Sequence, residues 1–403
     1  MAVFSRCLPL APFIQLTTFT LAGLGAVANS RSVIFSHNQI MVHLRLLDVR
    51  GVRGKCSYLL PIRRSVFSHQ ETEKFATYFQ VLKAAGCEVI VIDGSPPAVF
   101  EAHALIWGPI CRHRQVNRRF TYLNDKVNAI HTGIAISAKE KIILADDDVR
   151  YDAEQIGLIC DRLEKYDVVR PQNFIVPLRW WSRVEAARML INRATLRTAD
   201  YPGTCAFRRS AALRAGEYDG DVLFDNEEMI RHFARRGLKI DHQSDLFIRK
   251  NPPPFRKWLE QRPRQAYEDF GLCGKTFFFA SLLPLAAVLA FAGQNRALAF
   301  SASGLTIGSI VVAAVGRGRG EAAQVFPQSA CWAAPVWILE RAVSTYAAFC
   351  WYLVRGGYPF GDRILSRGIG RDWFVGGKIA SASWEQGADE YWRDFVTHSP
   401  GGG

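Results

Sequence analysis

The sequence predicts an α/β domain built on a mainly parallel sheet, followed by apolar helices in the last third of the chain. Three observations support this prediction. Short apolar strands alternate with helical patterns across residues 55–275. Acidic residues directly follow two of these strands, at the edge where open parallel sheets bind ligands. Two uncharged runs, 276–293 and 297–315, are each long enough to cross a hydrocarbon core of roughly 30 Å.

The first elements of the α/β region follow one another closely. Cys56–Ile62 is a short apolar strand. Residues 71–85 carry apolar side chains at helical spacing, and Gly86 provides the C-terminal stop. Residues 88–92 are mostly β-branched, which predicts a strand buried on both faces, and the turn 93–96 closes it.

The next elements lead to an acidic turn. A helix is expected over 125–138, and the strand Lys141–Ala145 runs directly into three aspartates at 146–148. Further along, a helix begins near residue 225 with apolar side chains on one face, and Gly237 lies just beyond its end. Asp93 and the aspartates at 146–148 each follow a strand, so both should lie at the carboxyl edge of the sheet.

The composition limits the classes of partner. The net charge of +13 favours anionic partners such as phosphates, nucleic acid or anionic lipid. The charge is spread along the chain with no aromatic stacking platform among it, so we expect no nucleic-acid partner. The nine cysteines are scattered singly without a CxxC pair, which argues against a disulfide scaffold or a zinc site and fits a reducing compartment.

The two uncharged runs predict a transmembrane hairpin over 276–315. Only Gln294, Asn295 and Arg296 separate them. The alternative is a buried helical hairpin in a soluble core. Two adjacent uncharged runs of this length are hard to bury in so basic a protein, and this favours the membrane.

A third apolar run covers 331–354, but Glu340 and Arg341 interrupt it. An ion pair at mid-bilayer is costly, so this run is either an interfacial helix or a third transmembrane helix. The arginines of the loop 316–320 and the basic tail 355–403 should be cytoplasmic by the positive-inside tendency. We therefore expect a multi-pass protein of the cell membrane with its α/β domain in the cytoplasm.

The N-terminal stretch has two interpretations. Residues 7–28 are apolar and follow Arg6, within an N-terminal segment 1–30. They predict a membrane anchor or peripheral helix, or a signal peptide, since 26–28 (Ala-Val-Ala) imitates a cleavage site. The weakly basic start favours the anchor.

The acidic triplet is the sharpest chemical signal. Asp146 and Asp148, one residue apart, can hold a divalent cation and the ribose of a nucleotide. Hard oxygen ligands suit Mn²⁺ or Mg²⁺. The alternative is a solvated acidic turn or a cap for a helix near Asp152. The position directly after a buried strand favours the ligand site.

A second acidic group begins the helix near 225. Either Asp225 or Glu228 can act as a general base that takes a proton from an attacking hydroxyl. The same two residues, three apart, also match a capping box that stabilises the helix only. One carboxylate can serve both purposes.

A basic group at 258–265 precedes the first membrane run. Arg262 and Arg264, beside Gln261, can grip a diphosphate through forked hydrogen bonds. The alternative is a juxtamembrane basic cluster that contacts anionic lipid head groups.

Taken in order, these motifs resemble family 2 of the inverting glycosyltransferases, which has the GT-A nucleotide-binding fold, and the resemblance covers about residues 55–275. It implies that Asp93 and Lys126 contact a nucleotide-sugar donor, with Asp146. The hairpin behind the motifs is similar to that of the ceramide glucosyltransferase-like and polysaccharide-synthase-like branches. The matching segments are Leu60-Pro61-Ile62, Ile92-Asp93-Gly94-Ser95, Asn124-Asp125-Lys126-Val127-Asn128-Ala129, Ala145-Asp146-Asp147-Asp148, Gly203-Thr204-Cys205-Ala206-Phe207-Arg208-Arg209 and Gln261-Arg262-Pro263-Arg264.

The resemblance implies transfer of a sugar from a nucleotide-diphosphate sugar to a lipid or glycan acceptor with inversion. Two residues depart from the family pattern. Asp225-Asn226 stands where the family has a Glu-Asp pair, so the usual base position holds an amide. Gln265 replaces the closing tryptophan, which lines the acceptor path in processive enzymes. The second departure favours single transfer onto a lipid over processive synthesis.

Two further functions remain open at this point. A nucleotidyltransferase of the same fold often carries a Gly-rich basic loop after its first strand, whereas residues 61–65 contain no glycine. A non-catalytic membrane partner with a decayed site is supported by Asn226 and Gln265. The intact Asp146 and Asp148 oppose it.

Overall fold

The fold is described from a computed structural model for residues 56–196, 204–270, 273–360 and 363–367 of the 403-residue chain. The chain divides into two compact units, Met1–Gly51 and Val52–Gly403, and all described residues belong to the second. The predicted N-terminal anchor or signal peptide and the basic tail beyond residue 367 lie outside the described residues.

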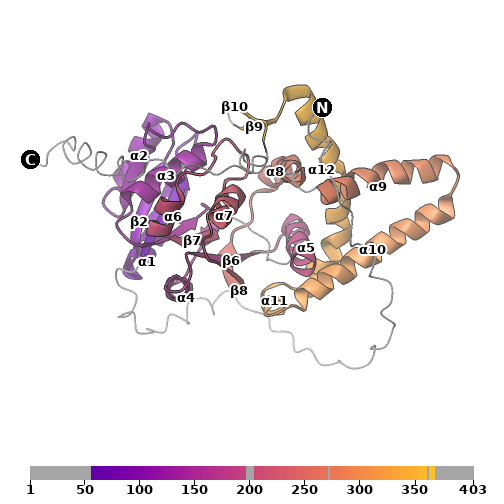
Figure 1. Cartoon of the computed structure of the whole chain (residues 1–403), viewed down its shortest axis with the longest axis horizontal. Coiled ribbons are helices and arrows are strands. Elements are labelled where there is room, and N and C mark those ends of the chain that lie inside the picture. Colours follow the sequence, from indigo (N-terminus) through magenta and orange to yellow (C-terminus); the bar gives the residue numbers. More distant parts are fainter. Residues whose placement is uncertain (1–55, 197–203, 271–272, 361–362, 368–403) are drawn as a thin grey trace, which may run out of the picture. The chain divides into compact units, whose positions relative to one another are not determined.

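An eight-stranded sheet with the order β3-β2-β1-β4-β7-β6-β8-β5 forms the centre of the α/β domain (Figure 1). β3, β2, β1 and β4 run parallel, as do β6 and β8, while β7 runs antiparallel to both of its neighbours and β5 to β8. The predicted α/β fold with a mainly parallel sheet is confirmed. The strands are β1 Cys56–Ile62, β2 Glu88–Asp93, β3 Arg112–Gln115, β4 Lys141–Ala145, β5 Val149–Arg150, β6 Val168–Ile175, β7 Thr204–Arg208 and β8 Ile240–Lys250.

Helices cover both faces of this sheet, because its central strands are buried on both sides. In β1, Tyr58 and Leu60 join an apolar cluster with side chains of α1, α2 and α4, whereas Leu59 joins a second cluster with α3, α6 and α7. The helices of this domain are α1 His69–Ala84, α2 Pro97–Trp107, α3 Asp125–Ile136, α4 Ala153–Arg162, α5 Trp180–Thr195, α6 Arg209–Ala215, α7 Asp225–Arg235 and α8 Phe255–Asp269.

Local capping fixes where three of these helices begin. The Ser68 side chain accepts a hydrogen bond from the backbone of α1, and Asp152 forms a capping box with Gln155 at α4. The Asn124 side chain accepts from the backbone N–H of Lys126 and thereby starts α3. That cap places Lys126 in the first turn of α3, beside the carboxyl edge of the sheet.

The C-terminal part is helical. Its elements are α9 Cys273–Phe291, α10 Asn295–Arg317, α11 Ala322–Val325, the 3-10 helix Gln328–Ala333, α12 Ala334–Arg355 and a hairpin of β9 Tyr358–Phe360 with β10 Arg363–Leu365. Among the described residues, α9 and α10 are long and apolar enough to cross a membrane. Only 6% of the apolar stretch of α9 and 11% of that of α10 is buried, so the hairpin does not form the core of a soluble domain.

Helix α10 packs closely on α5. A Cβ atom added to Gly316 would lie 1.9 Å from the carbonyl oxygen of Leu190, so only glycine allows the two backbones to approach this closely. Nearby, Arg193 donates to the carbonyl oxygen of Arg319, and Arg319 donates in return to that of Arg193. The C-terminal end of α10 is therefore attached to the α/β domain.

Glu340 and Arg341 of α12 lie against α8. The Arg341 side chain is 1% exposed and donates to Asp269 at 2.8 Å and to Gln265 at 3.0 Å. Glu340 lies 3.9 Å from Arg262. The sequence suggested a membrane interface for this pair because charges are costly in lipid. The structure provides partners for both charges within the protein.

Candidate active site

The acidic triplet forms a turn between β4 and β5. The N–H of Val149 donates to the carbonyl oxygen of Asp146 at 3.1 Å and closes the turn. Because β4 lies between β1 and β7, this turn is at the middle of the sheet edge where the parallel strands end. The side chains of Asp146 and Asp148 are 22% and 30% exposed, which leaves them accessible to a ligand.

Lys126 joins two acids that are far apart in the sequence. Its Nζ lies 2.6 Å from Asp146 Oδ1 and 2.8 Å from Asp225 Oδ2. Burial acts to lower the pKa of this ammonium group, but the two carboxylates outweigh burial and raise that pKa. Lys126 is therefore a fixed cation, and it holds Asp146 of the β4 turn close to Asp225 at the start of α7.

Two further basic residues surround the triplet. Lys250, the last residue of β8, lies 3.2 Å from Asp148 Oδ1, and Arg64, beyond the end of β1, lies 2.7 Å from Asp147 Oδ2. Burial, with the neighbouring Asp146 and Asp147 carboxylates, raises the pKa of Asp148, although Lys250 opposes the shift. Burial and the two neighbouring carboxylates thus disfavour the charged form of Asp148.

This donor set fits a divalent cation. Its ligands are carboxylate oxygens, which Mg²⁺ and Mn²⁺ prefer. Asp148 Oδ1 is buried and accepts no hydrogen bond, although the Lys250 ammonium lies nearby. In the structure Lys126 and Lys250 supply the positive charge beside Asp146 and Asp148. A bound cation would take over part of that role.

The structure separates the two candidate bases. α7 begins at Asp225 after the N-cap residue Phe224, and no side chain caps it, so the capping-box interpretation is wrong. The Asp225 carboxylate lies against Lys126. Glu228 is fully buried and forms a 2.7 Å ion pair with Arg235 of its own helix. Only Asp225 lies with the acidic turn.

The other two residues of the first turn of α7 also have partners. Lys126 Nζ donates to Asn226 Oδ1 at 3.4 Å, so the amide at the family's base position lies beside the same lysine as Asp225. Glu227 accepts from Arg170 of β6 at 2.9 Å. The start of α7 is therefore held by groups from α3 and from the sheet.

The basic motif lies on α8, and its members have different surroundings. Arg262 is 2% exposed and donates to Glu185 of α5 at 2.9 Å. Arg264 donates to the carbonyl oxygen of Leu223 at 3.0 Å, two residues before the start of α7. Gln261 is partly exposed. The motif therefore divides into one arginine inside the helical core and one beside the acidic helix start.

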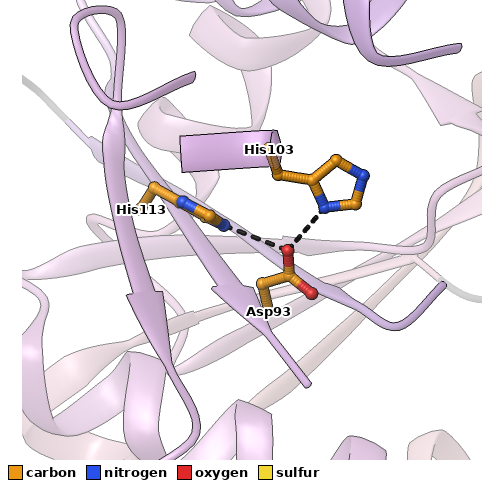
Figure 2. Close-up of side chains that lie close together, drawn as sticks. All are labelled: Asp93, His103 and His113. Atoms are coloured by element: carbon orange, nitrogen blue, oxygen red, sulfur yellow. Dashed lines mark hydrogen bonds and ion pairs between the residues drawn. The ribbon is translucent and has the colours of Figure 1, made fainter. Parts of the chain in front are cut away.

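Asp93 lies in a buried group of its own (Figure 2). His103 Nδ1 lies 2.7 Å and His113 Nε2 lies 3.1 Å from Asp93 Oδ2, and the backbone N–H of Ser95 donates to Oδ1 at 2.9 Å. Burial acts to raise the pKa of Asp93, but the hydrogen bonds from His113, Ser95 and His103 outweigh it and lower that pKa to about 2. Both oxygens of Asp93 already have partners within the protein.

Sequence reasoning missed four residues of these two groups. Arg64 and Lys250 each lie at or just beyond the end of a strand, and a search for basic residues at strand ends would have found them. His103 and His113 carry no such signal, because they lie 10 and 20 residues after Asp93 on a helix and an edge strand.

No protein-family model matches the chain, and no curated protein matches it. Solved structures with a similar arrangement include the mannosyltransferase PcManGT from Pyrobaculum calidifontis in complex with GDP-Man and Mn²⁺. That likeness has 15% identity, a TM-score of 0.41, and coverage of 73% of this chain and 87% of that one.

Glucosyl-3-phosphoglycerate synthase from Mycobacterium tuberculosis is similar at a comparable level. Its complex with Mn²⁺ and UDP-Glc has 17% identity and a TM-score of 0.38, covering 54% of this chain and 78% of that one. Its complex with phosphoglyceric acid has 17% identity and a TM-score of 0.35, covering 52% and 76%. At TM-scores below 0.5 these likenesses add no argument about the activity of this chain.

Proposed function

We propose that this chain is a membrane-associated glycosyltransferase that moves a sugar from a nucleotide-diphosphate sugar to a hydroxyl of a lipid or glycan acceptor, with inversion. One observation carries the proposal. Lys126 joins Asp146, at the carboxyl end of β4, to Asp225, at the start of α7. Three motifs that are separate in the sequence thus meet at the sheet edge where ligands bind in this class of fold.

The donor lies at the acidic turn in this proposal. Asp146 and Asp148 would hold Mn²⁺ or Mg²⁺, which would neutralise charge on the diphosphate. Lys126 and Lys250 add fixed positive charge beside the same carboxylates. In this proposal Arg264, which donates to the Leu223 carbonyl just before α7, binds the diphosphate together with Gln261.

Asp225 acts as the general base. Its carboxylate takes the proton of the acceptor hydroxyl while the hydroxyl oxygen forms a bond to the anomeric carbon. The bond between that carbon and the diphosphate oxygen breaks on the opposite face, and the nucleoside diphosphate leaves. Lys126 orients the carboxylate until the acceptor arrives. Glu228 has a structural role, because it is buried with the arginines of α7.

Two residues predicted to bind the donor take other roles. Arg262 positions α8, since its guanidinium is buried against Glu185. Asp93 positions the end of β2, since its oxygens accept hydrogen bonds from Ser95, His103 and His113. We propose that Arg262 and Asp93 stabilise the elements around the donor site without binding the donor.

Membrane association rests on the exposed apolar surface of α9 and α10. Phe291 is 93% exposed and Phe300 is 81% exposed, on helices that contain long uncharged stretches. Exposed apolar surface of this extent is costly in water and stable in lipid. We propose that these two helices form a transmembrane hairpin.

We propose that α12 lies at the membrane surface and does not cross. Its Arg341 is bound to α8, and the segment after it returns to the α/β domain. There Arg367 pairs with Asp219 at 2.6 Å, and Tyr267 donates to the carbonyl oxygen of Ser366. A crossing by α12 would separate these contacts. With the nucleotide-sugar donor made in the cytoplasm, the catalytic domain and residues 363–367 lie on that side.

The proposal is tested with the purified full chain in detergent. Nucleoside diphosphate release is measured from UDP- and GDP-sugars, with and without Mn²⁺ and lipid-alcohol acceptors. Asp225→Asn is expected to lose about 10²–10⁴-fold in turnover while it keeps donor affinity. Asp152→Asn is the matched control, because asparagine also caps α4, and it should keep full activity.

Other outcomes separate the alternatives. Pyrophosphate release would identify a nucleotidyltransferase, and failure to bind any nucleotide sugar would favour a non-catalytic membrane partner. Wild-type turnover that is unaffected by chelator would remove the metal from the mechanism. Equal turnover in Asp225→Asn and the wild type would remove Asp225.

A further inference from the structure

Three buried side chains converge at one edge of the sheet, apart from the acidic turn. Asp93 ends β2, His103 lies on α2 and His113 lies on β3 (Figure 2). One ligand atom from each, a carboxylate oxygen and two imidazole nitrogens, lies within 4.8 Å of the other two. All three residues are at most 5% exposed.

The charge of this group is unbalanced. Among the described residues, the ion-pair partners found for Asp93 are His103 and His113, and both are neutral unless protonated. A carboxylate buried without a cation is costly. A bound metal ion would supply the missing positive charge.

The ligand atoms are held before any ion binds. The His103 ring is stacked on Trp107 with centroids 4.2 Å apart, and the His113 ring is stacked on Phe100 at 4.4 Å. The second oxygen of Asp93 accepts the N–H of Ser95. Such outer contacts orient ligand groups in metal sites and lower the entropy lost on binding.

We propose that Asp93, His103 and His113 form a structural site for a zinc-class divalent cation, distinct from the acidic turn at 146–148. Two imidazole nitrogens and one carboxylate oxygen match the ligands of Zn²⁺. They do not match Mg²⁺, which prefers oxygen ligands. The isolated cysteines argued against a zinc site, but the site proposed here uses no thiolate ligand.

Binding of a zinc ion would require the ligand atoms to move from their positions in this structure. Zn–N and Zn–O distances of about 2.0 Å in a tetrahedron place ligand atoms roughly 3.3 Å apart. The observed separations from Asp93 Oδ2 are 2.7 Å to His103 and 3.1 Å to His113, both shorter than this value, and the two histidine nitrogens lie within 4.8 Å of each other. A small pocket bordered by Arg64 and Glu71 reaches His103, one of the three proposed ligands.

The site would fasten the edge of the sheet. β3 is a four-residue edge strand, and within the described part of the chain its strand partner is β2. A cation bound by His113 of β3 and Asp93 of β2 adds a link between these strands and α2. The expected consequence is a folded state that gains thermal stability with Zn²⁺.

The test uses the full chain in detergent, stripped of metal, with Zn²⁺ and Co²⁺ as probes. The wild type should bind one equivalent of Zn²⁺ after dialysis, give the visible absorption of four-coordinate Co²⁺, and show a higher unfolding temperature with Zn²⁺. His113→Gln should weaken Zn²⁺ binding by more than about 100-fold, beyond the cost of losing an outer-shell partner.

Two control variants define the site. His131→Gln removes another buried histidine, on α3, and should leave Zn²⁺ binding unchanged. Asp148→Asn alters the acidic turn and should also leave it unchanged. Loss of Zn²⁺ binding in Asp148→Asn with retention in His113→Gln would place the metal at the turn and overturn the proposal.

The wild-type protein alone can also overturn it, whether or not the variants fold. A wild type that takes up no stoichiometric Zn²⁺ and gives no Co²⁺ absorption shows a metal-free His-Asp-His group. In that case the unfolding temperature should not respond to Zn²⁺.

Discussion

Replacing Lys126 by methionine tests the contact on which the proposed site depends. The Nζ distances of 2.6 Å and 2.8 Å place Asp146 Oδ1 and Asp225 Oδ2 at most about 5.4 Å apart. Without the ammonium group these two carboxylates repel each other. At an effective dielectric constant of about 20, the repulsion is about 3 kcal/mol. Lys126→Met should therefore lower the free energy of unfolding by about 3 kcal/mol, the cost of breaking a buried ion pair.

The pH dependence has a defined sign. The ion pairs raise the pKa of Lys126 in the folded state. Its stabilisation is fully present below the unfolded pKa of about 10.4 and is lost as the pH rises through the higher folded value. The difference between wild type and variant should therefore stay constant between about pH 6 and 9.

The assay is chemical unfolding of the full chain in detergent, followed by tryptophan fluorescence, together with donor turnover. Lys126→Arg keeps the charge and should recover most of the stability. Lys74→Met removes an exposed lysine of α1 and is the matched control. If Lys126→Met lowers the free energy of unfolding by less than about 0.5 kcal/mol, as expected for an exposed pair, the contact of Lys126 with Asp146 and Asp225 would be refuted. Unchanged turnover would separate Lys126 from the mechanism.

Two further predictions concern α10 and α8. Gly316→Ala should destabilise the protein by about 1–3 kcal/mol because its Cβ would meet the α5 backbone. Gly308→Ala, with open space at its Cβ, should be neutral or stabilising; equal unfolding temperatures in detergent for both variants would contradict the close approach. Burial and neighbouring carboxylates raise the pKa of Glu268 to about 7. The free energy of unfolding should therefore fall as the pH rises from about 4.5 through 7. The free energy of unfolding of Glu268→Gln should exceed that of the wild type by about 2 kcal/mol at pH 8, after allowance for partial exposure, and should match it near pH 4. A constant difference across this range would contradict the raised pKa.

The sequence predicted the strands and helices whose apolar pattern is strong. Cys56–Ile62 and Lys141–Ala145 have the predicted bounds, and the helix predicted over 125–138 is Asp125–Ile136. β3 was missed because its residues, Arg-His-Arg-Gln, have no apolar pattern, and it forms only through pairing with β2. The long β8 was missed for the same reason: polar residues fill its first half, and a register shift interrupts its pairing with β6.

The site was predictable where one motif was enough and unpredictable where it depended on tertiary contacts. Sequence reasoning named Asp146 and Asp225 separately, and the family resemblance named Lys126. Their meeting at one point depends on the packing of α3 and α7 near the same sheet edge, which no local spacing encodes. The same holds for Arg262, whose partner Glu185 lies 77 residues away.

Gln265, a departure from the family pattern, has a physical reason in this chain. Its side-chain oxygen accepts a hydrogen bond from Arg341 of α12 at 3.0 Å, and its amide nitrogen lies 3.5 Å from Glu185 of α5. A tryptophan can donate one hydrogen bond and accept none, so it would leave Arg341 without this partner. The Gln265 amide can therefore accept from Arg341 of α12 and donate to Glu185 of α5.

Helix α8 links this buried group to the proposed site. Near its end, Gln265 and Asp269 hold Arg341 of α12, while Arg264 in the same helix holds the Leu223 carbonyl just before α7. Through these contacts α8 joins α12 to the segment just before α7. The buried Arg341, which interrupts the apolar run of α12, is therefore linked through α8 to the start of α7, where Asp225 lies.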